Sequence, residues 1–96
     1  MAKFHLSEKA SYDLDDIADY TFETFGERQA GKYSNELLDI FALLAQRPHM
    51  GRAANDLAKG LRSYPFQAHI IYYKTEGNDL FVVRVLHHSM DAKRHL

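Results

Sequence analysis

The spacing of apolar residues changes once along this chain of 96 residues, and the change restricts the possible folds more than any other feature. Between residues 8 and 46, apolar positions recur every three to four residues, the period of an amphipathic helix. From residue 61 onward they alternate, or run together in β-branched and aromatic stretches, which is typical of strands. The sequence therefore predicts helices followed by a sheet, in a length that fits one domain over residues 1–96.

Two helices are predicted, over residues 8–25 and 27–46. Ser7 is a plausible N-cap for the first, Gly26 separates the two, and Pro48 should end the second by pushing residue 47 out of helical geometry. So short a break joins the helices into an antiparallel hairpin. Their core-facing stripes are predicted to be Ala10, Leu14, Ile17, Ala18, Thr21 and Phe25, then Ala30, Tyr33, Leu37, Ile40, Phe41 and Leu44.

The predicted strands cover residues 2–6, 61–66, 67–75 and 79–87, with a hairpin turn at "EGND". In the last strand Phe81, Val83 and Val85 form a wholly apolar face, which should pack on the helices. Arg84 should then point away from the helices, with Arg62 on its side of the sheet. The first strand must join the others, because a lone strand is unstable. The predicted fold is α+β in the order β-α-α-β-β-β: a helical hairpin packed on a small, mostly antiparallel sheet, with a short C-terminal tail.

Composition excludes several classes of protein and site. The absence of cysteine excludes a disulfide framework, a thiolate metal site and a Cys nucleophile. No stretch is apolar enough to span a membrane, and the first ten residues do not read as a secretory signal. The net charge is only −1, but acids gather in residues 8–27 and bases in residues 59–96. Such a chain can present opposite charges to two partners, or both regions are simply solvated faces.

Three stretches resemble one protein family when taken together and in order. "LSEKASYDLDDIADYTFETFGERQAGKY" resembles its first helix, with an acidic "DLDDI" and a Gly before the second helix. "LAQRPHMGRAANDLAKGLRSYPFQAHIIYYK" resembles its loop, with a Pro, a Gly-Arg pair and Gly-Leu-Arg entering the strands. "VVRVLHHSMDAKRHL" is similar to its ending. The chain thus resembles the ParE toxins of the RelE/ParE superfamily, from type II toxin–antitoxin systems.

The resemblance implies a bacterial, cytoplasmic protein without a cofactor, a metal or a membrane partner. ParE-type toxins with a known target trap DNA gyrase on cleaved DNA, which would make this chain a protein inhibitor rather than an enzyme. A ParD-like antitoxin would hold it inactive in a hetero-oligomer. Contact with DNA would be indirect, through the antitoxin or gyrase.

Two groups of residues are predicted to bind these partners. The basic end is interpreted as a docking end, together with two arginines on strands. The predicted target-binding residues are Arg62, Arg84, Lys93, Arg94 and His95. Aromatic and apolar side chains off the main stripes, with nearby acids, are candidates for the antitoxin surface: Tyr12, Asp16, Asp19, Tyr20 and Leu38. For the apolar members, a wider core stripe is the alternative; for the acids, a solvated helix face.

Two other functions stay open. RelE-type relatives cut mRNA on the ribosome, and here Arg62 and Arg84 could supply charge while His87 and His88 move protons. The chain lacks the dense basic patch of those enzymes, and both arginines could instead pair with a carboxylate such as Asp91. The other alternative is a remnant that binds its antitoxin but has lost toxicity.

No metal site is predicted. His87 and His88 are adjacent, so on a regular strand they should point to opposite faces and could not share an ion. His5 or His69 could approach one of them across the sheet. The acidic run from Asp13 to Asp19 has helical spacing, but no phosphate-binding loop accompanies it to support a Mg²⁺ site. It is interpreted as a solvated face or a contact for basic antitoxin side chains.

Overall fold

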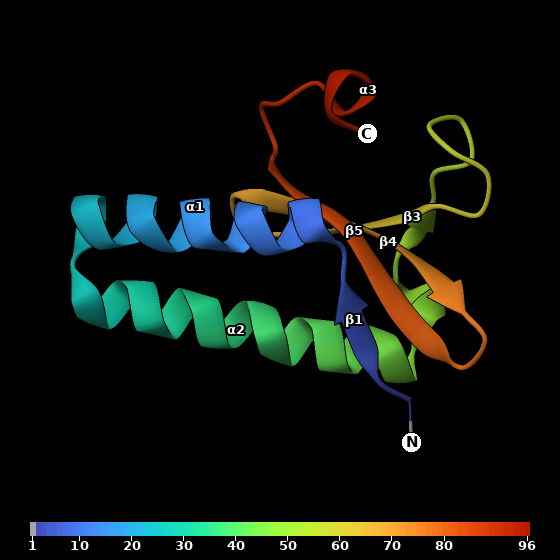
Figure 1. The fold of residues 1–96 in the computed structure, drawn as a ribbon, viewed down its shortest axis with the longest axis horizontal. Helices are drawn as coiled ribbons and strands as arrows, with labels where there is room; N and C mark the ends of the chain where they lie inside the picture. The colour runs from blue at the N-terminus through green and yellow to red at the C-terminus, as the bar shows by residue number, and fades with distance from the viewer. Residues whose placement is uncertain (1) are drawn as a thin grey trace.

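The computed structural model describes residues 2–96, and its elements follow the predicted order (Figure 1). They are β1 (Phe4–Leu6), α1 (Glu8–Phe25), α2 (Glu27–Gln46), the 3₁₀ helix η1 (Pro48–Met50), β2 (Arg52–Ala53), β3 (Arg62–Phe66), β4 (His69–Glu76), β5 (Asp79–His87) and α3 (Ala92–His95). The β-α-α-β-β-β order is confirmed, and three short elements, η1, β2 and α3, add to it. None of the helices in residues 2–96 has the length and apolarity needed to cross a membrane.

The helical hairpin begins and turns where local sequence signals predict. The Ser7 hydroxyl accepts the N–H of Ala10 at 2.9 Å, which caps α1. Gly26 has φ +93°, a conformation that favours glycine, and it reverses the chain into α2. Helix α2 ends at Gln46, two residues before Pro48.

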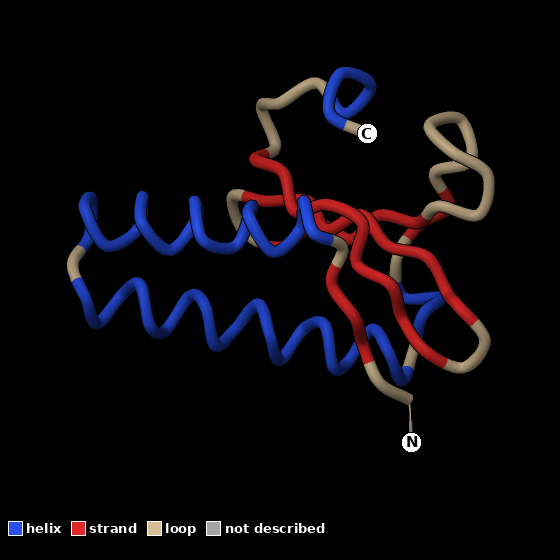
Figure 2. The backbone as a smooth tube through the Cα atoms, in the orientation of Figure 1, coloured by secondary structure: helices blue, strands red, loops and turns tan. Residues whose placement is uncertain are grey.

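The sheet has the strand order β1-β5-β4-β3-β2. Strand β1 pairs with β5 in parallel, and the other neighbours are antiparallel. The helices lie against one face of this sheet, while the hairpin end at Gly26 projects beyond it (Figure 2). The projection leaves Phe25 66% exposed, so the prediction that Phe25 belongs to the core stripe is wrong.

Two apolar clusters lie on opposite faces of the sheet. The larger one joins the helices to the sheet and consists of Ala10, Ile17, Tyr33, Leu37, Phe41, Leu44, Ala45, Ile71, Tyr73, Leu80, Val82 and Val85. The smaller one, here called the outer cluster, is formed by Ala54, Leu61, Tyr72 and Leu86, with Leu57, Ile70, Val83 and Ala92 packed against it. The loop after β2 and the C-terminal tail therefore cover the outer face.

A β-bulge in β5 overturns part of the predicted pattern. Tyr73 pairs with Val82 and Tyr72 with Arg84, so Val83 is an extra residue in the ladder. Before the bulge, Leu80 and Val82 face the helices, and after it Val85 does. The prediction for Val85 is confirmed, whereas that for Phe81 and Val83 is wrong. Phe81 is half-buried instead, with the Lys74 ammonium 5.7 Å from its ring centre.

Candidate functional site

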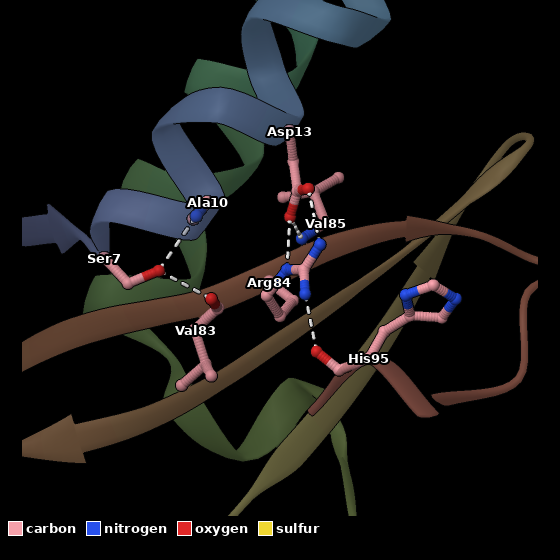
Figure 3. A network of polar contacts seen from close by, with 7 residues as sticks. All are labelled: Ser7, Ala10, Asp13, Val83, Arg84, Val85 and His95. Atoms are coloured by element: carbon pink, nitrogen blue, oxygen red, sulfur yellow. Dashed lines mark hydrogen bonds and ion pairs between the residues drawn. The ribbon is translucent and has the colours of Figure 1, made fainter. Parts of the chain in front are cut away.

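Arg84 joins helix α1, strand β5 and the C-terminal tail. Its Nε and Nη2 donate to the two carboxylate oxygens of Asp13, each at 2.8 Å, and its Nη1 donates to the carbonyl of His95 (Figure 3). The side chains of Arg84 and Asp13 are only 14% and 11% exposed. The hydrogen bonds to Asp13 raise the pKa of Arg84, which stays charged. The guanidinium thus holds three parts of the fold together.

Asp13 reaches this position because β1 is short. Beyond Leu6, the edge of β5 has no strand beside it, and Ser7 takes over by bonding the carbonyls of Val82 and Val83. The start of α1 then runs along this edge, where Asp13 accepts the Val85 N–H at 3.0 Å. Arg84 lies on the outer side of the sheet with Tyr72, as expected from its facing, but its guanidinium still reaches α1. The alternative of a pair with a carboxylate such as Asp91 is met by Asp13 of α1 instead.

The tail itself is ordered by few contacts. The side chain of Asp91 accepts the N–H of Lys93 at 3.1 Å and caps the single turn of α3. Ala92 packs on the outer cluster, and His95 is tied to Arg84 through its carbonyl. Lys93 and Arg94 are exposed, and His95 is half-buried. Of the predicted target-binding residues, these three lie together on the last turn of α3.

Arg62 lies apart from that surface. It pairs with Tyr73, on the helix-facing side, whereas Arg84 pairs with Tyr72, on the outer side, so the prediction that the two arginines share a side is wrong. The Nε and Nη2 of Arg62 donate to the Gly51 carbonyl at 3.1 and 2.6 Å. The structure therefore does not bring the two arginines together around one phosphate-sized space.

The histidines near the end of β5 cluster instead of diverging. The rings of His87 and His88 are 4.3 Å apart, since β5 ends at His87 and the alternation stops there; the prediction of opposite faces is wrong. His69 approaches His87 at 5.6 Å, as expected, and bonds the Tyr33 hydroxyl at 2.6 Å. Burial lowers the pKa of His69, and its two histidine neighbours lower it further. His5 is elsewhere, paired with Asp79 at 3.2 Å.

This cluster is not arranged for a metal. Across residues 2–96, no three His, Asp or Glu side chains are placed to hold an ion. A neutral His69 bonded to Tyr33 is instead part of the wall of a surface depression.

Two adjoining hollows, of about 380 and 570 Å³, run along α1 toward the hairpin end. We call them together the groove. Both contain Tyr20, His69 and His87; the first adds Asp13, Asp16 and Met90, and the second adds Phe25. Tyr20 is 65% exposed although it is large and aromatic. Apolar side chains with acids beside them fit a partner segment that is both apolar and basic.

The predicted antitoxin residues divide among several surfaces. Asp16 and Tyr20 line the groove. Tyr12 borders a different hollow, between α1 and the tail, and Asp19 lies with Phe22 on another side of the hairpin. Leu38 is exposed on α2.

Comparisons with known proteins decide the family. The family described as "ParE toxin of type II toxin-antitoxin system, parDE" matches residues 4–92. The chain belongs to the ParE toxin family. It is the toxin component of a type II toxin–antitoxin system.

Relatives agree with this family, and two solved structures share the fold of this chain. The chain is 36% identical to Toxin ParE1 of Caulobacter vibrioides, over 100% of this chain and 99% of that protein. It is 34% identical to Toxin ParE1 of Mycobacterium tuberculosis, covering 99% and 98%. Its fold is similar to a chain of the chromosomal ParDE system from P. aeruginosa, with a TM-score of 0.76, 20% identity and coverage of 91% and 95%. A conserved hypothetical protein from Helicobacter pylori shares the fold at a TM-score of 0.57, with 17% identity and coverage of 93% and 97%.

Proposed function

We propose that this toxin stops bacterial growth in the cytoplasm by poisoning DNA gyrase, and that a ParD-like antitoxin neutralises it in a hetero-oligomer. The toxin acts as a binding protein without chemistry of its own. A ligand shifts an equilibrium only by its differential affinity for the two states, so the toxin must bind gyrase more tightly when the DNA is cut. Contact with DNA is made by gyrase and the antitoxin.

The observation that carries this proposal is the anchored basic tail. Lys93 and Arg94 are exposed on an ordered turn, capped by Asp91 and held to the sheet through His95. Ordering the tail in the free protein lowers the entropy lost when it binds. The separation of Arg62 from Arg84 favours this docking role over RelE-type cleavage, which needs cations gathered at one phosphate.

The first experiment compares three purified proteins in a gyrase reaction with supercoiled DNA and in a reconstituted translation mix. Wild type should accumulate linear DNA and leave translation intact. Lys93→Ala/Arg94→Ala should lose most of this activity. A matched control, Arg28→Ala/Lys32→Ala, removes the same charge from exposed positions of α2 and should retain it.

The alternatives give distinct results. Cleaved mRNA with gyrase unaffected would refute the proposal in favour of an endonuclease. If the wild type produces neither linear DNA nor cleaved mRNA, and its expression leaves growth unaffected, the protein is a remnant that only binds its antitoxin.

The groove is the proposed antitoxin surface. Tyr20 is large, rigid and exposed at the junction of its two hollows, and Asp16 adds negative charge beside it. Acidic side chains at the rim speed association with a basic segment more than they tighten it. Truncating a hot-spot tyrosine at the centre of an interface costs at least about 2 kcal/mol, and each 1.4 kcal/mol or so corresponds to tenfold in affinity.

The test of this surface is calorimetric titration of a ParD-like antitoxin with toxin variants. Tyr20→Ala should weaken binding about tenfold or more. Phe22→Ala truncates a similarly exposed aromatic on the same helix, outside the groove, and serves as its control. If Tyr20→Ala weakens antitoxin binding no more than Phe22→Ala does, the groove is not the antitoxin surface.

A further inference from the structure

The order of the C-terminal tail must come from its contacts with the rest of the fold. Helix α3 has four residues, Ala92–His95, and a single turn is unstable in water by itself. It meets the rest of the fold through the packing of Ala92 on the outer cluster and the hydrogen bond from Arg84 to the His95 carbonyl, and His95 also borders a hollow beside α1. The Arg84 bond is the polar one that reaches the last turn.

The direction of that bond is set from α1. A guanidinium is planar and rigid, so fixing two of its nitrogens fixes the third. With Nε and Nη2 on the two oxygens of Asp13, Nη1 is aimed at His95. Asp13 is in turn held by the Val85 N–H, at 3.0 Å. Asp13 therefore fixes the orientation of Arg84, and Arg84 in turn fixes the position of the His95 carbonyl (Figure 3).

Neither Asp13 nor Arg84 is well placed to contact a target directly. The two side chains are 11% and 14% exposed, and three nitrogens of Arg84 are already bonded within the fold. An effect of either residue on docking must then pass through the tail. This distinguishes them from Lys93 and Arg94, which are exposed.

We propose that Asp13 and Arg84 are positioning residues, which hold the tail in the orientation that presents Lys93 and Arg94 to the target. The docking half of this inference rests on the proposed function, whereas the positioning half concerns the free toxin alone. The tail should be as rigid as the helices in the wild type. It should become mobile when either member of the pair is replaced, while the core stays unchanged.

The experiment measures backbone ¹⁵N order parameters in the free toxin. Wild-type residues 92–95 should have values near those of rigid backbone, about 0.85, and Asp13→Asn and Arg84→Met should bring them below about 0.6. Asp15→Asn is the matched control, because it removes the same charge from an exposed position on the same helix. Amides in the buried part of α2, such as that of Leu44, should stay rigid in every variant.

Several results would overturn the inference. One is a tail that is mobile in the wild type, or that stays rigid in both variants. Another is a loss of order in α2 that matches the loss in the tail, since this would show general destabilisation. Arg84→Met breaks the same pair but keeps the aliphatic stem of the side chain, so the order parameters can be measured in this variant even if Asp13→Asn fails to fold.

The gyrase reaction then separates this inference from the proposed function. Asp13→Asn should need about tenfold more toxin for half-maximal DNA cleavage, corresponding to the loss of a charge-assisted contact. If deletion of residues 91–96 abolishes cleavage but Asp13→Asn acts like the wild type, positioning is unnecessary and the inference is refuted. If the deletion changes nothing, the docking role fails, and the order parameters alone decide the positioning role.

Discussion

Replacing Gly51 with Ala should strongly destabilise the toxin. A Cβ at this position would lie 2.2 Å from the Tyr73 hydroxyl oxygen, 2.7 Å from the Ser63 carbonyl oxygen and 2.9 Å from Tyr73 Cε1. Tyr73 is fully buried, and Ser63 belongs to the β3 backbone, so neither can move away easily. The close approach therefore requires a glycine, and φ plays no part in this requirement.

The size of the effect follows from what Tyr73 must give up. Its hydroxyl accepts the Gly51 N–H at 2.9 Å and donates to the Pro48 carbonyl at 2.6 Å. Losing both bonds in a buried site costs about 1 to 3 kcal/mol for each group left unsatisfied. Gly51→Ala should thus lower the free energy of unfolding by about 3 to 5 kcal/mol, a large part of the roughly 5 to 15 kcal/mol of a whole domain.

Urea denaturation of the wild type and four variants tests this value: Gly51→Ala, Gly31→Ala, Tyr73→Phe and Gly51→Ala/Tyr73→Phe. Gly31→Ala makes the same chemical change in α2, where nothing lies within 4 Å of the added Cβ, and it should stabilise by about 0.5 to 1 kcal/mol. Tyr73→Phe removes the atom at 2.2 Å, so Gly51→Ala should cost about 1 to 2 kcal/mol less in that background. A cost under about 1 kcal/mol for Gly51→Ala, or perfect additivity with Tyr73→Phe, would refute the reasoning.

Three further predictions concern capping and pH. Ser7→Ala should lower the free energy of unfolding by about 1 to 2 kcal/mol in urea denaturation, because the hydroxyl caps α1 and also donates to the Val83 carbonyl; a loss under about 0.5 kcal/mol would contradict this. Burial lowers the pKa of His69, so the unfolded chain takes up the proton first and stability should fall as the pH drops below about 6.5, less steeply in His69→Asn. If Tm changes equally with pH in the wild type and in His69→Asn, the contribution of His69 is refuted. The Lys3 N–H lowers the pKa of Asp79, whose contribution to stability is present above about pH 4 and is lost on further acidification. The difference in Tm between the wild type and Asp79→Asn should shrink over that range, and a constant difference would contradict it.

The helices could be predicted because their signals are local. Ser7, Gly26 and Pro48 act on the backbone within a few residues, and all three delimit the hairpin as expected. Helical periodicity assigns Phe25 to the core although it is exposed, because periodicity shows which face of a helix is apolar but cannot show where the sheet beneath that face ends.

The alternation of residues along β5 could not predict which of its side chains face the helices. The bulge at Val83 shifts the pattern by one residue, and "VV" in the sequence gives no sign of which valine is extra. The partner of Arg84 is also beyond what a local sequence pattern can predict. Asp13 is 71 residues away in sequence, and it reaches Arg84 only because β1 ends early and leaves the edge of β5 to α1.

The parallel pairing of β1 with β5 has a consequence for synthesis of the toxin. Phe4 pairs with Leu80 and Leu6 with Val82, so β1 has no neighbouring strand until the distant segment that holds β5 has been made. The helical hairpin depends on local contacts and can form early, whereas pairing between such distant segments is slow and comes last. A chain terminated before residue 80 lacks both the partner of β1 and the residues after it. The sheet and the basic tail therefore become available to the fold together, after the helical hairpin.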